Sequence, residues 1–248
     1  MRRVLRLSRT RGACTARALC ETPRVPLFWR RVATVAVAMA AMGVSVAGAA
    51  RTADFRDEFT AFDTGQWLKV SRPFGYGAVD AANLGVSNGL LGMKLPAGRL
   101  DGAEMRTTSL YRYGTYRTRM KLADAPSSLT AFFLYKKPDY AQEIDIEIFN
   151  DASRKVMFST YAGGAMTHTV TSQLPFDATA DFHEYTIEYG PGSARFLADG
   201  VQLQSWSNGV TRSSMYLFVN AWFPSWLAGD RPTTDRYTYV DWVEHVER

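Results

Sequence analysis

Three carboxylates occupy every second position of one short segment of this 248-residue chain, and an isoleucine follows each of them. Glu143, Asp145 and Glu147 are the three acids. Successive side chains of a β-strand point to opposite faces, so the segment predicts a strand with one acidic face and one apolar face. Because like charges side by side oppose folding, we expect the acids to be kept for chemistry. Paired carboxylates are the groups that cleave glycosidic bonds.

The spacing of the two glutamates favours one type of cleavage. Glu143 and Glu147 lie four residues apart, or about 13 Å along a strand that rises about 3.3 Å per residue. Side chains that lean toward each other would bring the carboxyl groups to about 5–6 Å, the spacing of a retaining glycosidase; an inverting enzyme needs a wider gap. Asp145 is shorter, and we expect it to orient the nucleophile through a hydrogen bond and to couple to both neighbours. At least one of the three acids should have a raised pKa.

Two other interpretations of the acids stay open at this point. They could form a solvated sheet face, although the strand offers no cation among them. They could instead bind a hard cation such as Ca²⁺, although calcium sites gather more often on loops, with Asn, Gly and backbone carbonyl groups. Catalysis is the interpretation that we follow.

The elements that would position these acids are strands. Short β-prone runs alternate with turn residues such as Asn88-Gly89 and Asp199-Gly200, and no long amphipathic helix or repeat interrupts them. This pattern predicts an all-β fold, an antiparallel β-sandwich or jelly roll. Asp199-Gly200 predicts a hairpin. We expect strands at 90–95, 103–110, 114–121, 129–135, 143–149, 156–161, 184–189, 195–198, 215–222 and 237–245.

The same alternation sorts the aromatic residues. Phe133 and Tyr135 would share one face of their strand, and Tyr216, Phe218, Asn220 and Trp222 one face of another. The opposite positions carry aliphatic residues suited to a core. A second packed layer would explain any single aromatic, but together with the acidic strand the mixed face predicts a concave sugar-binding cleft. Pyranose rings stack on aromatic faces, and their hydroxyl groups need polar partners.

The first fifty residues predict an export leader. Arg30 and Arg31 precede an apolar run from 32 to 46, and Ala47-Gly48-Ala49 suits a signal peptidase. A retained signal anchor is the alternative. We therefore expect a leader over 1–50, a single catalytic domain over 51–248, and a secreted, periplasmic or extracellular protein, without stable membrane insertion if the leader is cleaved.

Charge and cysteine content exclude several classes of protein. The chain has 29 basic and 24 acidic residues, but residues 1–49 hold nine arginines and one acid, which leaves 20 basic and 23 acidic residues. No basic patch predicts nucleic-acid binding. Both cysteines, Cys14 and Cys20, lie in the leader, so thiol chemistry is not expected of the domain. Three scattered histidines make a zinc hydrolase a poor interpretation.

The segment Glu143-Ile144-Asp145-Ile146-Glu147 resembles the E-x-D-x-E signature of glycoside hydrolase family 16. The likeness continues through segments 101–107, 113–116, 132–135, 176–185, 199–200, 220–222 and 239–243, in the family's order, and covers about 55–248. It implies a licheninase-like, retaining endo-β-glucanase on a concanavalin-like β-jelly roll. It also implies that Glu143 is the nucleophile, Asp145 the assisting acid and Glu147 the general acid/base.

The resemblance also implies roles for residues outside the acidic strand. For some of them, the alternation of side chains along their strands gives the same expectation. Glu104 and Arg106 resemble the family's cleft pair beside the nucleophile. The positions expected to contact sugar are Phe133, Tyr135, Tyr161, Asn220, Trp222 and Trp226. Asp241 resembles a position that binds a structural calcium ion in some members. No cofactor is expected for catalysis, and the metal question stays open. We expect a monomer whose partner is a polysaccharide.

The substrate expected from the resemblance is mixed-linkage β-1,3-1,4-glucan. The spacing lacks the extra residue before the last glutamate that laminarinase and agarase branches often carry. However, this chain has Ala141-Gln142 just before the motif, where licheninases usually have Trp-Asp. In the following strand it has Ser159-Thr160-Tyr161, where licheninases have an Asn before a Tyr-Tyr pair. Another β-glucan, a bacterial exopolysaccharide or transglycosylation therefore stay open as alternatives. A non-catalytic, lectin-like sugar-binding domain is the alternative from another class.

Overall fold

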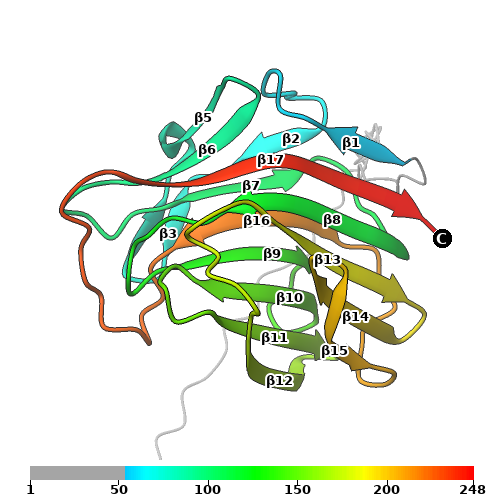
Figure 1. The fold of residues 1–248 in the computed structure, drawn as a ribbon. Helices are drawn as coiled ribbons and strands as arrows, with labels where there is room; N and C mark the ends of the chain where they lie inside the picture. The colour runs from blue at the N-terminus through cyan, green and yellow to red at the C-terminus, as the bar shows by residue number, and fades with distance from the viewer. Residues whose placement is uncertain (1–53) are drawn as a thin grey trace, which may run out of the picture. The chain divides into compact units, whose positions relative to one another are not determined.

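The computed structural model describes residues 54–248, and the expected leader lies outside these residues. Two antiparallel sheets pack face to face and enclose one core (Figure 1). Only a short 3₁₀ turn, Ala81–Asn83, interrupts the strands of the described part. The all-β antiparallel sandwich expected from the sequence is thus confirmed. Within residues 54–248, no helix has the length and hydrophobicity needed to cross a membrane.

The sheet that carries the three acids has seven strands in the order β12-β11-β10-β9-β16-β7-β2. β10 lies near its middle, so both of its edges are paired (Figure 1). In chain order its strands are β2 (Trp67–Lys69), β7 (Ala103–Thr107), β9 (Leu129–Tyr135), β10 (Gln142–Phe149), β11 (Lys155–Ala162), β12 (Ala165–Gln173) and β16 (Tyr216–Trp222).

The second sheet has eight strands in the order β15-β14-β13-β8-β17-β6-β5, and β1 pairs with β17 beside this path. Its strands are β1 (Phe55–Asp57), β5 (Leu84–Ser87), β6 (Leu90–Leu95), β8 (Gly114–Lys121), β13 (His183–Gly190), β14 (Ser193–Ala198), β15 (Val201–Trp206) and β17 (Arg236–Glu247). A separate hairpin joins β3 (Arg72–Phe74) to β4 (Gly77–Val79). The predicted hairpin at Asp199-Gly200 is confirmed by the pairing of β14 with β15.

The apolar side of β10 fixes which way its acids point. Ile144, Ile146 and Ile148 are at most 1 % exposed and belong to the core between the sheets. Burial of an isoleucine side chain contributes about 1.5–3 kcal/mol. A slip of one residue would lose all three contributions and drive carboxylates into the core, so the alternation holds the register. The acids must therefore lie on the outward face of the seven-stranded sheet.

All ten strands expected from the sequence are present, with ends that differ by a few residues. The strands that sequence analysis missed are β1 to β5 and β12. β1 to β4 are only three residues long, too short for an alternating pattern to be recognised. β12 is an edge strand whose side chains are exposed or half-buried throughout, so it lacks the apolar half of the pattern.

Candidate active site

The three acids lie in the middle of the outward face of the seven-stranded sheet, which we call the acidic face. Glu143 is paired across the strands with Tyr135 of β9 and Tyr161 of β11. β10 pairs with both neighbouring strands in antiparallel orientation and without a register shift. Because no bulge interrupts it, the three side chains stay on one face, as the sequence predicts.

The neighbours of the other two acids are smaller or apolar. Asp145 lies between Phe133 of β9 and Ser159 of β11, and Glu147 lies between Ala131 and Met157. No basic residue is paired directly with any of the three acids. The strand neighbours therefore remove water from the carboxyl groups without neutralising them.

Burial dominates the protonation of the three acids. It raises the pKa of Glu147 to about 7. Burial, followed by the charges of Glu147 and Asp139, also raises the pKa of Glu143, which hydrogen bonding with Asp145 and the charge of Arg72 lower. Burial and both glutamates raise the pKa of Asp145 well above its usual range. All three shifts have the direction expected for acids that are partly or wholly removed from water.

Aromatic rings form the surface beside the acids. Phe133 and Phe218 stack with their ring centroids 4.9 Å apart, and Tyr135 and Tyr216 pack against them. Phe133 is only 7 % exposed, so it supports this surface more than it offers a ring of its own. Tyr135 is half-buried and donates its hydroxyl hydrogen bond to Asp139. The shared face expected for these residues is confirmed.

Glu104 and Asn220 are brought together, but beneath a residue that sequence analysis missed. Arg72 of β3 donates to both oxygens of Glu104, at 3.0 and 2.9 Å, and the amide of Asn220 donates to the same carboxylate at 3.1 Å. Glu104 is fully buried, whereas the side chain of Arg72 is 42 % exposed. The group of this cluster that solvent reaches is therefore Arg72.

The hairpin β3–β4 also covers Trp222. The ring of Phe74 stacks on Trp222 with centroids 4.1 Å apart, and the guanidinium of Arg72 lies 3.9 Å from the centroid of Phe74. A cation over an aromatic face is attracted by the ring's electron density. Arg72, Phe74 and Trp222 thus form one stack beside Asn220, and only Trp222 was expected from the sequence.

The remaining predicted positions lie farther from the acids or have other partners. Arg106 donates to the carbonyl of Thr107 and packs 4.2 Å over the ring of Tyr216. Tyr161 lies beside Glu143 and contacts the exposed ring of Tyr140. Trp226 is 54 % exposed in the loop after β16 and touches Phe149, the last residue of β10. It therefore lies beyond the Glu147 end of the acidic strand.

Asp241, the position that resembles a calcium ligand, has a cation as its partner. Arg119 donates to its carboxylate at 2.6 Å. Within residues 54–248 there is no group of three or more histidine, cysteine or acidic side chains arranged to hold a metal ion. Asp241 thus offers a single carboxylate, which is already paired with Arg119. Calcium binding at this position stays a prediction.

Replacing Arg72 with methionine is expected to lower the free energy of unfolding by about 1–3 kcal/mol, because the buried carboxylate of Glu104 keeps only the amide donor of Asn220. Because solvent reaches the guanidinium of Arg72, the loss of stability should be smaller than for a fully buried ion pair. Urea denaturation at pH 7 measures it. The matched control is Arg99→Met, which removes an exposed pair with Asp101 and should cost at most about 1 kcal/mol. Equal losses would contradict the role given to Arg72.

Comparison with known proteins places these residues in a family context. Residues 74–244 match the model of the glycosyl hydrolases family 16. A β-glucanase of Bacillus subtilis (strain 168) is 29 % identical over 229 residues, which cover 85 % of this chain and 93 % of that protein.

Solved structures give the same picture. The β-glucanase of Bacillus licheniformis superposes with a TM-score of 0.71 at 26 % identity, covering 79 % of this chain and 98 % of the other. A prokaryotic β-1,3-1,4-glucanase (lichenase) derived from a mouse hindgut metagenome superposes with a TM-score of 0.69 at 26 % identity, covering 79 % and 99 %. The family match over residues 74–244 includes the acidic strand.

Proposed function

The chain belongs to glycosyl hydrolase family 16 and is an endo-β-glucanase, and on this premise we propose that it cleaves mixed-linkage β-1,3-1,4-glucan with retention of anomeric configuration. The observation that carries the proposal is the uninterrupted acidic strand: three carboxyl groups on one face, in register with tyrosines on both sides. Paired glutamates of this kind supply the nucleophile and the proton donor of a retaining glycosidase.

In the proposed first step, the carboxylate of Glu143 attacks the anomeric carbon of the bound sugar. The bond between this carbon and the glycosidic oxygen breaks, and Glu147 gives its proton to the departing oxygen. The result is a glycosyl ester on Glu143. In the second step, Glu147 takes a proton from water, the water oxygen attacks the same carbon, and the ester bond to Glu143 breaks. Two inversions at one carbon give overall retention.

Asp145 is the residue that would keep Glu143 ready for attack. Asp145 is buried between two glutamates, and burial and the charges of both glutamates raise its pKa well above its usual range. A protonated Asp145 donates a hydrogen bond to Glu143, and this bond favours the carboxylate form of the nucleophile. Glu147, with a pKa raised to about 7 by burial, keeps the proton that an acid catalyst needs.

The substrate assignment rests on the strand and on the relatives. β10 has no bulge at the acidic residues, which favours the licheninase-like branch expected from the sequence. One structural relative is described as a β-1,3-1,4-glucanase, and the curated relatives are described as β-glucanases. Secretion belongs to the same proposal, since a polymer of this kind lies outside the cell; the amino-terminal residue of protein from the culture medium would test leader cleavage.

The proposal is tested by product analysis on a panel of mixed-linkage glucan, laminarin, carboxymethyl cellulose and κ-carrageenan. We expect rapid release of short oligosaccharides from mixed-linkage glucan and little from the others. Proton NMR of fresh products should show the β anomer before mutarotation. Cleavage of a galactan alone would contradict the substrate, and an initial α anomer would contradict retention.

A further inference from the structure

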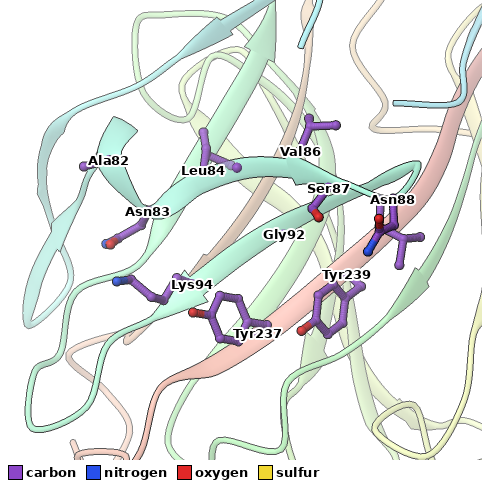
Figure 2. A pocket seen from close by; sticks show the side chains of 12 residues that line it. Ala82, Asn83, Leu84, Val86, Ser87, Asn88, Gly92, Lys94, Tyr237 and Tyr239 are labelled. Carbon is purple, nitrogen blue, oxygen red and sulfur yellow. The ribbon is translucent and has the colours of Figure 1, made fainter. Parts of the chain in front are cut away.

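A depression of about 560 Å³ lies on the outward face of the eight-stranded sheet, over β5, β6 and β17 (Figure 2). Leu91, Met93 and Val240 of these strands point into the common core, so the residues between them face solvent. The acidic residues lie on the outward face of the other sheet. The depression is therefore separated from the acidic face by the full core of the sandwich.

Two tyrosines line one side of this depression. Tyr237 and Tyr239 of β17 are 38 % and 36 % exposed, with ring centroids 5.8 Å apart and ring planes within 15° of parallel. Figure 2 shows both rings side by side, with Lys94 of β6 next to Tyr237. Within residues 54–248, neither hydroxyl group forms a hydrogen bond with another protein group, so the rings and hydroxyls are available to a ligand.

The floor beside the rings is made of glycine. Gly85 of β5 and Gly92 of β6 are paired across the strands, and Tyr239 follows Gly92 in the same row. A Cβ added at Gly85 would meet no atom within 4 Å, and one at Gly92 would touch both tyrosine rings at 3.7–3.8 Å. The absence of side chains at two adjacent positions leaves a trough along the edges of the rings. We call Gly85, Gly92, Lys94, Tyr237 and Tyr239 the tyrosine furrow.

The charge of the furrow favours a neutral occupant. Among the described residues that line it, the only cation is Lys94, whose ammonium group lies 3.7 Å from Asp235. The side chains of Asn83, Ser87 and Asn88 add polar groups around the rim. Exposed parallel rings, a trough and neutral hydrogen-bonding groups suit a sugar chain, because pyranose faces pack on aromatic rings and their hydroxyl groups pair with polar side chains.

We propose that the tyrosine furrow is a second, non-catalytic binding site for a neutral β-glucan chain. This inference rests on the proposed function, since the same polymer would occupy the furrow and the acidic face. A long chain held at a second site stays close to the acidic face after it dissociates there, and so its effective concentration rises. The furrow therefore acts on polymers and leaves the cleavage of short oligosaccharides unchanged.

The test measures migration of the protein in native gels that contain mixed-linkage β-1,3-1,4-glucan. Glu143→Gln serves as the background, so that the polymer stays intact. Tyr237→Ala combined with Tyr239→Ala should weaken the apparent affinity at least about fivefold, because both stacking surfaces are lost. Gly85→Leu should do the same by filling the trough, at a position where added bulk meets no neighbouring atom.

Two matched controls distinguish stacking from general damage. Tyr237→Phe with Tyr239→Phe keeps the rings and should retain binding. Val201→Ala changes an exposed apolar residue on β15, at the other edge of the same sheet, and should also retain it. Unchanged migration of the alanine pair and of Gly85→Leu would overturn the proposal, as would equal losses in the phenylalanine pair. A dimer in size-exclusion chromatography that Gly85→Leu dissociates would also overturn it.

Activity measurements separate this inference from the proposed function. With Glu143 intact, the alanine pair should lower kcat/KM on the polymer about threefold or more and leave it unchanged on a soluble tetrasaccharide. Wild-type protein that cleaves no glucan would refute the proposed function, while the gel measurement would still decide whether the furrow binds glucan. Equal loss on polymer and tetrasaccharide would refute the furrow alone.

Discussion

Replacing Glu143 with alanine is expected to lower kcat on mixed-linkage glucan by at least about 10⁴-fold, because the proposed nucleophile is gone. The loss should appear in kcat more than in KM, since Glu143 contributes little to binding of the ground state. Sodium azide should restore part of the activity by entering the space of the missing carboxylate. Its product should be a glycosyl azide of α configuration, because azide attacks once, from the side that Glu143 occupies.

The folded state should tolerate this change well. Glu143 is a half-buried acid with a raised pKa and no paired base among its strand neighbours, so its removal relieves part of a burial cost. Circular dichroism during thermal unfolding provides the check, and Glu143→Gln, which keeps the shape of the side chain, is the matched variant. Retention of more than a few per cent of wild-type activity by both variants would contradict the role of nucleophile.

Replacing Glu147 with glutamine should lower kcat on the polymer by about 10²–10⁴-fold, the usual contribution of a general acid and base. An aryl glycoside with a good leaving group needs no proton in the first step. It should therefore show a burst of released phenol, followed by slow turnover. This dependence on the leaving group separates Glu147 from Glu143, whose replacement should stop both steps for every substrate.

The pH profile gives a second signature of Glu147. Its folded-state pKa is raised to about 7, so the proton needed for catalysis is present below this pH and lost above it. Wild-type kcat/KM on the polymer should fall as the pH rises through about 7, and this limb should be absent in Glu147→Gln. The exposed acid Glu58 offers a control, because Glu58→Gln should keep the wild-type profile. A high-pH limb that persists in Glu147→Gln would assign it to another group.

The acidic face could be predicted from the sequence because the alternation of β10, β9 and β16 fixes both the core and the outward residues. Ile146 and Val219 had to be buried, so Asp145 and Asn220 had to face outward. A periodic pattern contains this information within one strand, and no knowledge of the neighbouring strands is needed.

Arg72 could not be predicted in this way. It precedes a proline, which indicates only extended backbone, and its strand is three residues long. Its place over Glu104 depends on how the hairpin docks, and contacts with residues distant in the sequence decide this.

The tyrosine furrow could not be predicted for a similar reason. The two tyrosines at 237 and 239 visibly share a face, but the pairing of Gly85 with Gly92 requires the register between strands.

The docking of the β3–β4 hairpin is a close backbone fit. Gly75 has a positive φ of 60°, and a Cβ there would lie 2.1 Å from the carbonyl oxygen of Phe223. Tyr76 donates its backbone hydrogen bond to that same oxygen at 2.9 Å. A side chain at position 75 would therefore push the hairpin away from the end of β16.

Because the hairpin lies outside both sheets, we expect it to open locally before the domain unfolds. Its two three-residue strands join neither sheet, and backbone hydrogen bonds of Tyr76 with Phe223 and of Ala78 with Gly102 hold it to the domain. Segments of this kind unfold locally at a lower free energy than the whole domain and exchange their amide protons sooner. Each opening would take Arg72 and Phe74 away together, exposing Glu104 and one face of Trp222 while the sandwich stays folded. Because the charge of Arg72 lowers the pKa of Glu143, each opening would also raise the pKa of that acid.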